Sequence, residues 1–238
     1  FSTPFDDASL DMLVELEMPA LKIASPDLTY TPFLEKVAET GLPVVLSTGM
    51  GSVEEIGEAL HALRKANSVI LLHCVSNYPS QYDEMNLACL AGLQSRFELP
   101  VGLSDHTLDN LSAVVAASLG AVMIEKHFTL DRNLPGVDQS ISMQPEDLRQ
   151  LKSEILNVTT IIGEGKKEIQ KSEIPVRQSA RRSLVARVDI PAGTPLKPAM
   201  LACKRPGTGI SPNELDRVLG KSSKVAILAE QVLTWDMF

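Results

Sequence analysis

The chain has 238 residues, 44% of them hydrophobic, which suffices for one large domain and a small second one. Its net charge of −8 argues against a nucleic-acid-binding surface, and no apolar run approaches the roughly 20 residues of a membrane span. Three scattered cysteines fit neither a disulfide framework nor a CxxC zinc site, so we expect a reducing, cytoplasmic location.

Short apolar runs alternate with helix-length amphipathic segments from residue 1 to about residue 165, as in βα units around a parallel sheet. The predicted strands begin at Phe1, Leu21, Val44, Val69, Val101 and Ala121. Ser52 and Glu55 have capping-box spacing, and Pro145 opens a last long helix. Six units in series predict either a doubly wound sheet or part of an eight-stranded barrel.

The alternation of apolar runs and amphipathic segments ends near residue 165. Residues 165–180 are polar, basic and without apolar periodicity, so we interpret them as a linker. Residues 181–238 contain three strand-like patterns, at 183–190, 224–229 and 231–235, separated by proline- and glycine-containing turns. We therefore predict a small β-rich domain at residues 181–238.

Reactive groups in a parallel βα array lie at the carboxyl ends of the strands. Polar side chains end all six predicted strands: Thr3, Ser25, Ser47, Thr48, Ser76, Asn77, Tyr78, Ser104, His106, Glu125 and His127. Such a series is difficult to explain by packing alone. It predicts a functional site at this end of the sheet.

The strand period of two puts Ser104 and His106 on one face, and Glu125 and His127 on one face. Two imidazoles can then converge with a hydroxyl and a carboxylate. Such ligands suit Mn, Zn or Fe better than Ca. By spacing alone, however, a strand histidine is more often structural, so both interpretations stay open.

Lys22 lies in the middle of a predicted strand between apolar neighbours, so in a barrel its ammonium group points inward and needs a partner. Three roles are open: a Schiff-base nucleophile, a ligand for an anionic substrate, or one half of an internal ion pair. Ser25, Ser47 and Ser104 favour the second role, because hydroxyls and one lysine form a cradle for phosphate or carboxylate.

Taken together and in order, the motifs resemble those of the sialic acid synthase family, which condenses phosphoenolpyruvate with an N-acetylated hexosamine. The matching segments are FSTPF (1–5), LKIAS (21–25), LSTGM (46–50), LHCVSNYP (72–79), GLSDHT (102–107), EKHFT (125–129), PGVD (135–138), RRSLVARVDIPAG (181–193) and KRPGTG (204–209). The resemblance implies an α/β fold: a TIM-type (β/α)8 barrel at residues 1–164 and an antifreeze-like β-clip (SAF) domain at 181–238.

The resemblance also implies roles for single residues. It makes His106 and His127 ligands of a divalent metal, manganese or alternatively magnesium. It assigns phosphoenolpyruvate binding to Thr3, Lys22, Ser25, Ser47, Ser76 and Ser104, and sugar binding to Phe5, Asn77, Tyr78, Asp138 and Arg205. It gives catalytic roles to Lys22, His106, Glu125, His127 and Asp138, and it implies a domain-swapped homodimer in which each SAF domain covers the partner's barrel mouth.

The chain departs from the family pattern in three places. It begins at the family's third strand, so we expect the first two βα units to be absent and Phe1 to lie inside a longer protein. Asp27 and Ser76 stand where relatives have Glu and Asn, which leaves the acceptor open among sialic, legionaminic, pseudaminic and spore-coat sugars. Two other functions stay open: a Schiff-base aldolase using Lys22, and a non-enzymatic binding protein with an ice-binding-like tail.

Overall fold

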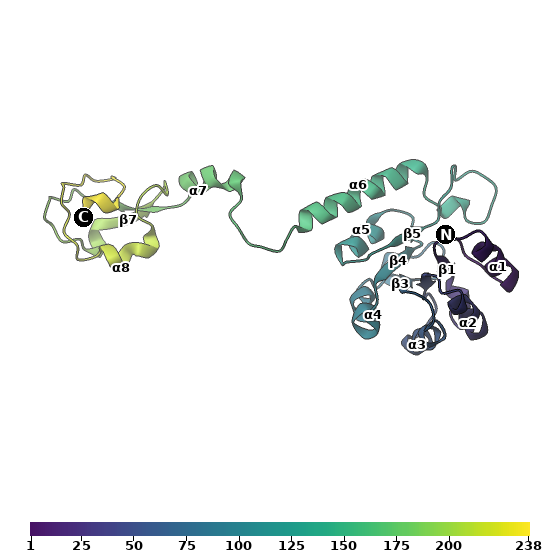
Figure 1. The fold of residues 1–238 in the computed structure, drawn as a ribbon. Coiled ribbons are helices and arrows are strands. Elements are labelled where there is room, and N and C mark those ends of the chain that lie inside the picture. The colour runs from purple at the N-terminus through teal and green to yellow at the C-terminus, as the bar shows by residue number, and fades with distance from the viewer. The chain divides into compact units, whose positions relative to one another are not determined.

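A computed structural model describes all 238 residues of the chain. The chain divides into two compact units, Phe1–Gly165 (unit 1) and Lys166–Phe238 (unit 2), which are described separately (Figure 1).

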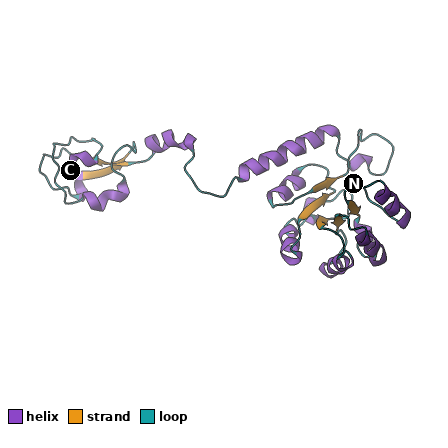
Figure 2. Cartoon of the chain, viewed as in Figure 1, coloured by secondary structure: helices purple, strands orange, loops and turns teal.

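Unit 1 contains a curled parallel sheet with helices on its outer side (Figure 2). The strands are β1 (Leu21–Ile23), β2 (Val44–Ser47), β3 (Val69–Cys74), β4 (Val101–Asp105) and β5 (Ile124–Lys126). Each strand pairs in parallel with the next, in the order β1-β2-β3-β4-β5. A doubly wound sheet reverses its strand order at a switch point, whereas this order runs in one direction. The architecture is therefore barrel-like.

Six α-helices alternate with or follow these strands: α1 (Asp7–Glu15), α2 (Thr31–Glu39), α3 (Val53–Ala62), α4 (Cys89–Phe97), α5 (Leu111–Ser118) and α6 (Pro145–Ile162). The capping box predicted before α3 is confirmed: Ser52 N donates to Glu55 Oε2 at 2.7 Å, and Glu55 N donates to Ser52 Oγ at 3.2 Å. Pro145 opens α6 as predicted. None of the helices combines the length and the apolar composition that crossing a bilayer requires.

Successive side chains of the strands lie on opposite faces of the sheet, and this alternation separates the core from the polar residues. The main core joins strand and helix residues, including Leu21, Ile23, Val44, Leu46, Leu71, Leu103, Phe33, Leu34, Ile56 and Leu90. Full burial of each such side chain contributes roughly 1.5–3 kcal/mol to stability. Lys22, Ser47 and Ser104, which alternate with these strand residues, are buried outside that cluster.

The prediction of a strand at Phe1 is wrong, because this segment forms one bridge and no strand. Ser2 forms a single parallel bridge with Leu21, in which Lys22 N donates to Ser2 O at 2.9 Å. Pro4 has no N–H with which to continue the ladder. The sixth predicted strand is also shorter than expected, because β5 begins at Ile124 and not at Ala121.

Unit 2 begins with helical structure inside the segment that we interpreted as a linker: a 3₁₀ turn at Lys171–Glu173 and helix α7 (Ile174–Ala180). Its sheet pairs β6 (Ser183–Ala186) antiparallel with β7 (Leu201–Lys204), and a short helix α8 (Leu215–Val218) follows. A core of its own supports this unit, with Leu184, Ile190, Leu196, Ile210, Ile227 and Leu233 among the buried residues.

The tail strands were predicted only in part. Residues 183–186 form β6 as expected, but β7 was not predicted. The patterns at 224–229 and 231–235 are not strands and contribute single antiparallel bridges, Ile190↔Ile227 and Val185↔Val232. These segments are loops that place Ile227 and Leu233 in the core, so their apolar residues alternate as they would in a strand. Local periodicity cannot distinguish such a loop from a strand.

Candidate active site

A cleft of about 450 Å³ opens at the carboxyl ends of the strands of unit 1. Ten predicted site residues line it: Thr3, Phe5, Lys22, Ser25, Ser47, Tyr78, Ser104, His106, Glu125 and His127. The parallel strands end at one edge of the sheet, and this brings together side chains from Thr3 to His127 that are distant in sequence.

Lys22 is buried in this cleft and forms the ion pair that was one of its three open roles. Its Nζ lies 3.5 Å from Glu125 Oε2 and donates to the carbonyl oxygen of Ile23 at 3.1 Å. Ser104 Oγ donates to Glu125 Oε1 at 2.8 Å. Burial lowers the pKa of Lys22 below its ordinary value, and the charge of Glu125 opposes this shift. The cleft thus holds a desolvated ammonium group with one carboxylate beside it.

The two predicted metal ligands lie side by side with Tyr78. The ring centroids of His106 and His127 are 5.3 Å apart, and the Tyr78 ring lies 4.1 Å from that of His106. His106 Nδ1 donates to the carbonyl oxygen of Val75 at 2.8 Å, so the proton lies on Nδ1 and the lone pair on Nε2. Asp138 Oδ2 lies 3.7 Å from His127 Nδ1. A carbonyl oxygen therefore orients the His106 imidazole, and a carboxylate lies close to that of His127.

The pKa values of the two histidines are shifted in opposite directions. Burial lowers the pKa of His127, and the neighbouring His106 adds to that effect. Burial also acts to lower the pKa of His106, but hydrogen bonds with the Cys74 thiol and the Val75 carbonyl outweigh it and raise that pKa.

The two imidazoles offer two ligands to a divalent metal. Their ring centroids lie 5.3 Å apart, but no group of three or more His, Cys, Asp or Glu side chains is gathered into a ligand set. A closed structural site needs four protein ligands, whereas a catalytic metal keeps positions for water or substrate oxygens. His106 and His127 would hold such a metal, and a substrate could complete its coordination.

Serine hydroxyls line the opposite part of the cleft. Gly49 N donates to Ser25 Oγ at 2.9 Å. Ser47 is almost fully buried, and its Oγ has no hydrogen-bond partner. A buried hydroxyl without a partner is costly, and here it lines an open cleft. Ser47 therefore marks a position where a polar ligand can supply the missing bond.

The hydroxyls of Ser25 and Ser76 and the thiol of Cys74 converge next to Gly49, and we call this group the cradle. It leaves no room for a side chain at position 49. A Cβ at position 49 would lie 2.3 Å from Ser76 Oγ, 2.9 Å from Ser25 Oγ and 3.0 Å from Cys74 Sγ. We expect Gly49→Ala to lower kcat/KM for an anionic substrate about tenfold or more, because the displaced hydroxyls no longer converge. Gly92→Ala is the matched control, since a Cβ there meets open space. Equal steady-state kinetics for the two variants would contradict the cradle.

The remaining predicted residues lie apart from the cleft lining. Asn77 Nδ2 donates to both carboxylate oxygens of Glu84, at 3.2 and 2.9 Å. Ser76 does not line the cleft, but its Oγ lies 3.9 Å from Sγ of the lining residue Cys74. Arg205 belongs to unit 2 and is exposed there.

Cys74 is a cleft residue that the sequence analysis missed. It is buried and lines the cleft with Lys22 and Ser104. Burial acts to raise the pKa of its thiol, but hydrogen bonds with His106 and Ser25 outweigh this and lower it. The sequence places Cys74 close to the end of the strand predicted from Val69, where site residues are expected. In the structure Cys74 is the register partner of Ser104 in β4.

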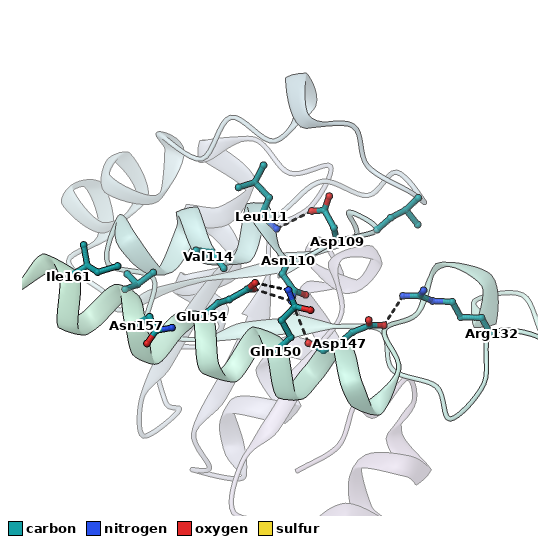
Figure 3. A pocket seen from close by; sticks show the side chains of 12 residues that line it. Asp109, Asn110, Leu111, Val114, Arg132, Asp147, Gln150, Glu154, Asn157 and Ile161 are labelled. Carbon is teal, nitrogen blue, oxygen red and sulfur yellow. Dashed lines mark hydrogen bonds and ion pairs between the residues drawn. The ribbon is translucent and has the colours of Figure 1, made fainter.

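A larger cavity, of about 650 Å³, lies between α5 and α6 (Figure 3). None of the predicted site residues lines it. Its polar groups bond to one another: Asn110 Nδ2 donates to Glu154 Oε2 at 3.1 Å, and Arg132 pairs with Asp147 at 2.8 Å. We interpret it as a groove between two helices, because its charged groups are already engaged.

Comparison with known proteins agrees with the motifs. Residues 1–167 match the NeuB family, and residues 181–238 match the SAF domain. The chain is 39% identical to the N,N'-diacetyllegionaminic acid synthase of Legionella pneumophila, over 99% of this chain and 68% of that protein. It is 33% identical to the pseudaminic acid synthase of Helicobacter pylori, over 99% and 70%.

A solved structure gives the same assignment. The N-acetylneuraminic acid (sialic acid) synthetase of Leptospira borgpetersenii is 43% identical, with a TM-score of 0.68 over 73% of this chain and 61% of that one. The resemblance seen in the motifs is thus confirmed. The chain belongs to the NeuB family and carries a SAF domain at residues 181–238.

Proposed function

We propose that the protein condenses phosphoenolpyruvate with the open-chain aldehyde of an N-acetylated amino sugar, such as N-acetylmannosamine, to form a nine-carbon sugar acid and phosphate. The observation that carries this proposal is one cleft in which a buried lysine and serine hydroxyls lie together with two oriented imidazoles. Relatives named for legionaminic, pseudaminic and sialic acids support this reaction class and leave the acceptor sugar open.

The lysine side of the cleft binds phosphoenolpyruvate. The Lys22 ammonium and the hydroxyls of Ser25 and Ser47 offer one positive charge and hydrogen-bond donors to phosphate and carboxylate oxygens, and Ser104 lines the same part of the cleft while it donates to Glu125. Because these groups are already buried and held in place, they stabilise the anion without reorganising. Unit 1 is acidic overall, so placed donors rather than a general positive field must hold the substrate.

The histidine side of the cleft receives the sugar. When bound, a divalent metal supplies Lewis-acid polarisation of the aldehyde oxygen and a template for both substrates. His106 and His127 would hold it, and Tyr78 and Phe5 line the cleft beside them. Asp138, close to His127, orients that imidazole or a sugar hydroxyl.

The reaction balances without a further co-reactant. Carbon 3 of phosphoenolpyruvate forms a bond to the aldehyde carbon, and the aldehyde oxygen takes up a proton. Water adds to carbon 2, and the resulting tetrahedral centre loses phosphate by cleavage of its C–O bond and leaves a keto acid. Lys22 neutralises the phosphate and carboxylate charges throughout.

The direct test is phosphate release by the full-length protein from phosphoenolpyruvate, with N-acetylmannosamine and with a bacillosamine-derived diacetamido sugar. Release that depends on one of these sugars supports the proposal, and the preferred sugar identifies the acceptor. The aldolase alternative instead expects pyruvate to be trapped on Lys22 by borohydride. A binding protein with an ice-binding-like tail would show thermal hysteresis and no phosphate release with either sugar.

The pH dependence follows from the lowered pKa of Lys22. The anion binds to the ammonium form, so kcat/KM for phosphoenolpyruvate falls as pH rises through that pKa, below the 10.5 of an ordinary lysine. A pH–rate profile between about pH 7 and 10 measures this decline. Lys22→Arg keeps its charge over this range, so its profile should stay flat at alkaline pH. A similar decline in both proteins would assign it to another group.

The two units carry opposite charges, which supports an assembly in which the SAF domain of one copy covers the cleft of another. Unit 1 has 9 basic and 23 acidic residues and unit 2 has 13 and 7, so the net charges are −14 and +6. Opposite potentials of this size favour association and fix orientation. In this domain-swapped homodimer, Arg205 would reach the sugar in the partner's cleft.

Mixing two inactive variants tests this arrangement. His127→Ala disables the cleft and Arg205→Ala disables the tail, so each homodimer alone should be nearly inactive. After unfolding and refolding together, mixed dimers would combine an intact cleft with an intact tail from the other copy. Random mixing then restores about a quarter of the wild-type sites. No recovery in dimers shown to be mixed would mean that Arg205 acts within its own chain or not at all.

A further inference from the structure

Next to the two histidines, strands β4 and β5 are joined by a buried ion pair. Asp105 immediately precedes His106, Lys126 immediately precedes His127, and Asp105 and Lys126 are register partners. Asp105 Oδ2 lies 2.7 Å from Lys126 Nζ, and the two side chains are 0% and 4% exposed. The pair therefore links the two strand ends at the positions directly next to the imidazoles.

The hydrogen bonds of this pair are complete. Lys126 Nζ also donates to the carbonyl oxygens of Thr107 and Asp109, at 2.9 and 2.8 Å. Asp105 Oδ1 accepts from the backbone N and the Oγ1 of Thr107, at 2.9 and 2.8 Å. The three donors of the ammonium group and both carboxylate oxygens are thus used. Moving either the Asp105 or the Lys126 side chain would leave a buried charge without its partner, so the network favours a single geometry.

The network continues into the neighbouring loop. The carboxylate of Asp109 accepts a hydrogen bond from the hydroxyl of Tyr82, which follows β3, and one from Leu111 N at 2.9 Å. The backbone oxygen of His106 accepts from Ser80 N at 3.1 Å. The segments that follow β3 and β4 are therefore bonded to each other and, through Lys126, to the end of β5.

We infer that Asp105 and Lys126 are positioning residues that set the separation of the His106 and His127 imidazoles. A buried ion pair is weak support for stability, since apolar replacements of similar size are often as stable. Its place between the two histidine-bearing strand ends gives it a geometric role instead. The expected effects of this pair on metal binding and catalysis rest on the proposed function. Its expected effect on the positions of the two imidazole rings is independent of that function.

The test removes both charges and keeps the side-chain sizes, in the double variant Asp105→Asn with Lys126→Met. Unlike either single change, this leaves no lone buried charge, so the thermal midpoint should stay within about 5 °C of wild type. We expect the Mn²⁺ dissociation constant, measured by electron paramagnetic resonance titration, to rise about 10- to 100-fold. The control is Glu39→Gln with Lys65→Met, which removes an exposed ion pair of 3.4 Å.

A second readout keeps the inference separate from the proposed function. The ¹⁵N resonances of the His106 and His127 rings, recorded without metal or substrate, should move in the double variant and stay in place in the control. If wild type binds Mn²⁺ and the double variant binds it equally well, the inference is overturned. If wild type binds no Mn²⁺, the metal role fails, and the ring resonances alone decide: a shift supports the positioning role and unchanged resonances overturn it.

Discussion

The double variant His106→Ala with His127→Ala is expected to lose about a thousandfold in kcat/KM for phosphate release. The two imidazoles, with ring centroids 5.3 Å apart, are the oriented nitrogen donors of the cleft. Without them a metal has no protein nitrogen to bind, and Lewis-acid polarisation contributes several kcal/mol to catalysis. Steady-state phosphate release measures the loss, and Mn²⁺ titration should show that the tight site has disappeared.

His61→Ala is the control for this experiment, because His61 is exposed on α3 and lies outside the cleft. Chelation provides a second comparison. Treatment of wild type with EDTA should reproduce the loss, added Mn²⁺ should reverse it, and neither should affect the double variant further. Undiminished turnover of the double variant would remove the histidines from the mechanism.

The Lys22→Met variant is expected to lower kcat/KM for phosphoenolpyruvate about a hundredfold, mainly through KM. Hydrogen bonds from a charged donor to an anion contribute roughly 1.5–3 kcal/mol, and a factor of ten in rate corresponds to about 1.4 kcal/mol. The fold should tolerate the change, since Glu125 keeps its hydrogen bond from Ser104 and is partly exposed to solvent. Initial rates over a range of phosphoenolpyruvate concentrations give both constants.

Lys36→Met is the matched control, because Lys36 is an exposed lysine that pairs with Asp7, and neither residue lines the cleft. The same preparations can be treated with pyruvate and borohydride. Covalent labelling of wild type that disappears in Lys22→Met would favour the aldolase over the synthase. An unchanged KM in Lys22→Met would show that the anion is held elsewhere.

Much of the site could be predicted because it follows from local rules. Parallel strands end at one edge, and side chains alternate along each strand, so the polar residues at the carboxyl ends of β1, β2, β4 and β5 had to lie near one another. Ser25, Ser47, Ser104, His106 and His127 are found there. The apolar stripes of the helices predicted the outer layer for the same reason, since helical periodicity determines which face is buried.

Other features depend on which partner a side chain or a strand meets in the folded chain. Asn77 follows β3 with Tyr78, but it bonds to Glu84 and leaves Tyr78 to line the cleft. In unit 2, β6 pairs with Leu201–Lys204, whereas the more regular pattern at 224–229 forms one bridge. Local sequence shows which residues can form a strand, but a ladder needs a neighbour with a matching register.

The amino-acid sequence by itself determined the βα rhythm of unit 1, the polar strand ends and the separate tail, because each is set by spacing along the chain. Only the tertiary structure decided that the strand order runs one way, that Lys22 pairs with Glu125, and that Asp105 and Lys126 join the two histidine strands. Those contacts link residues 21 or more positions apart, so they exist only after the sheet has curled and excluded water around them.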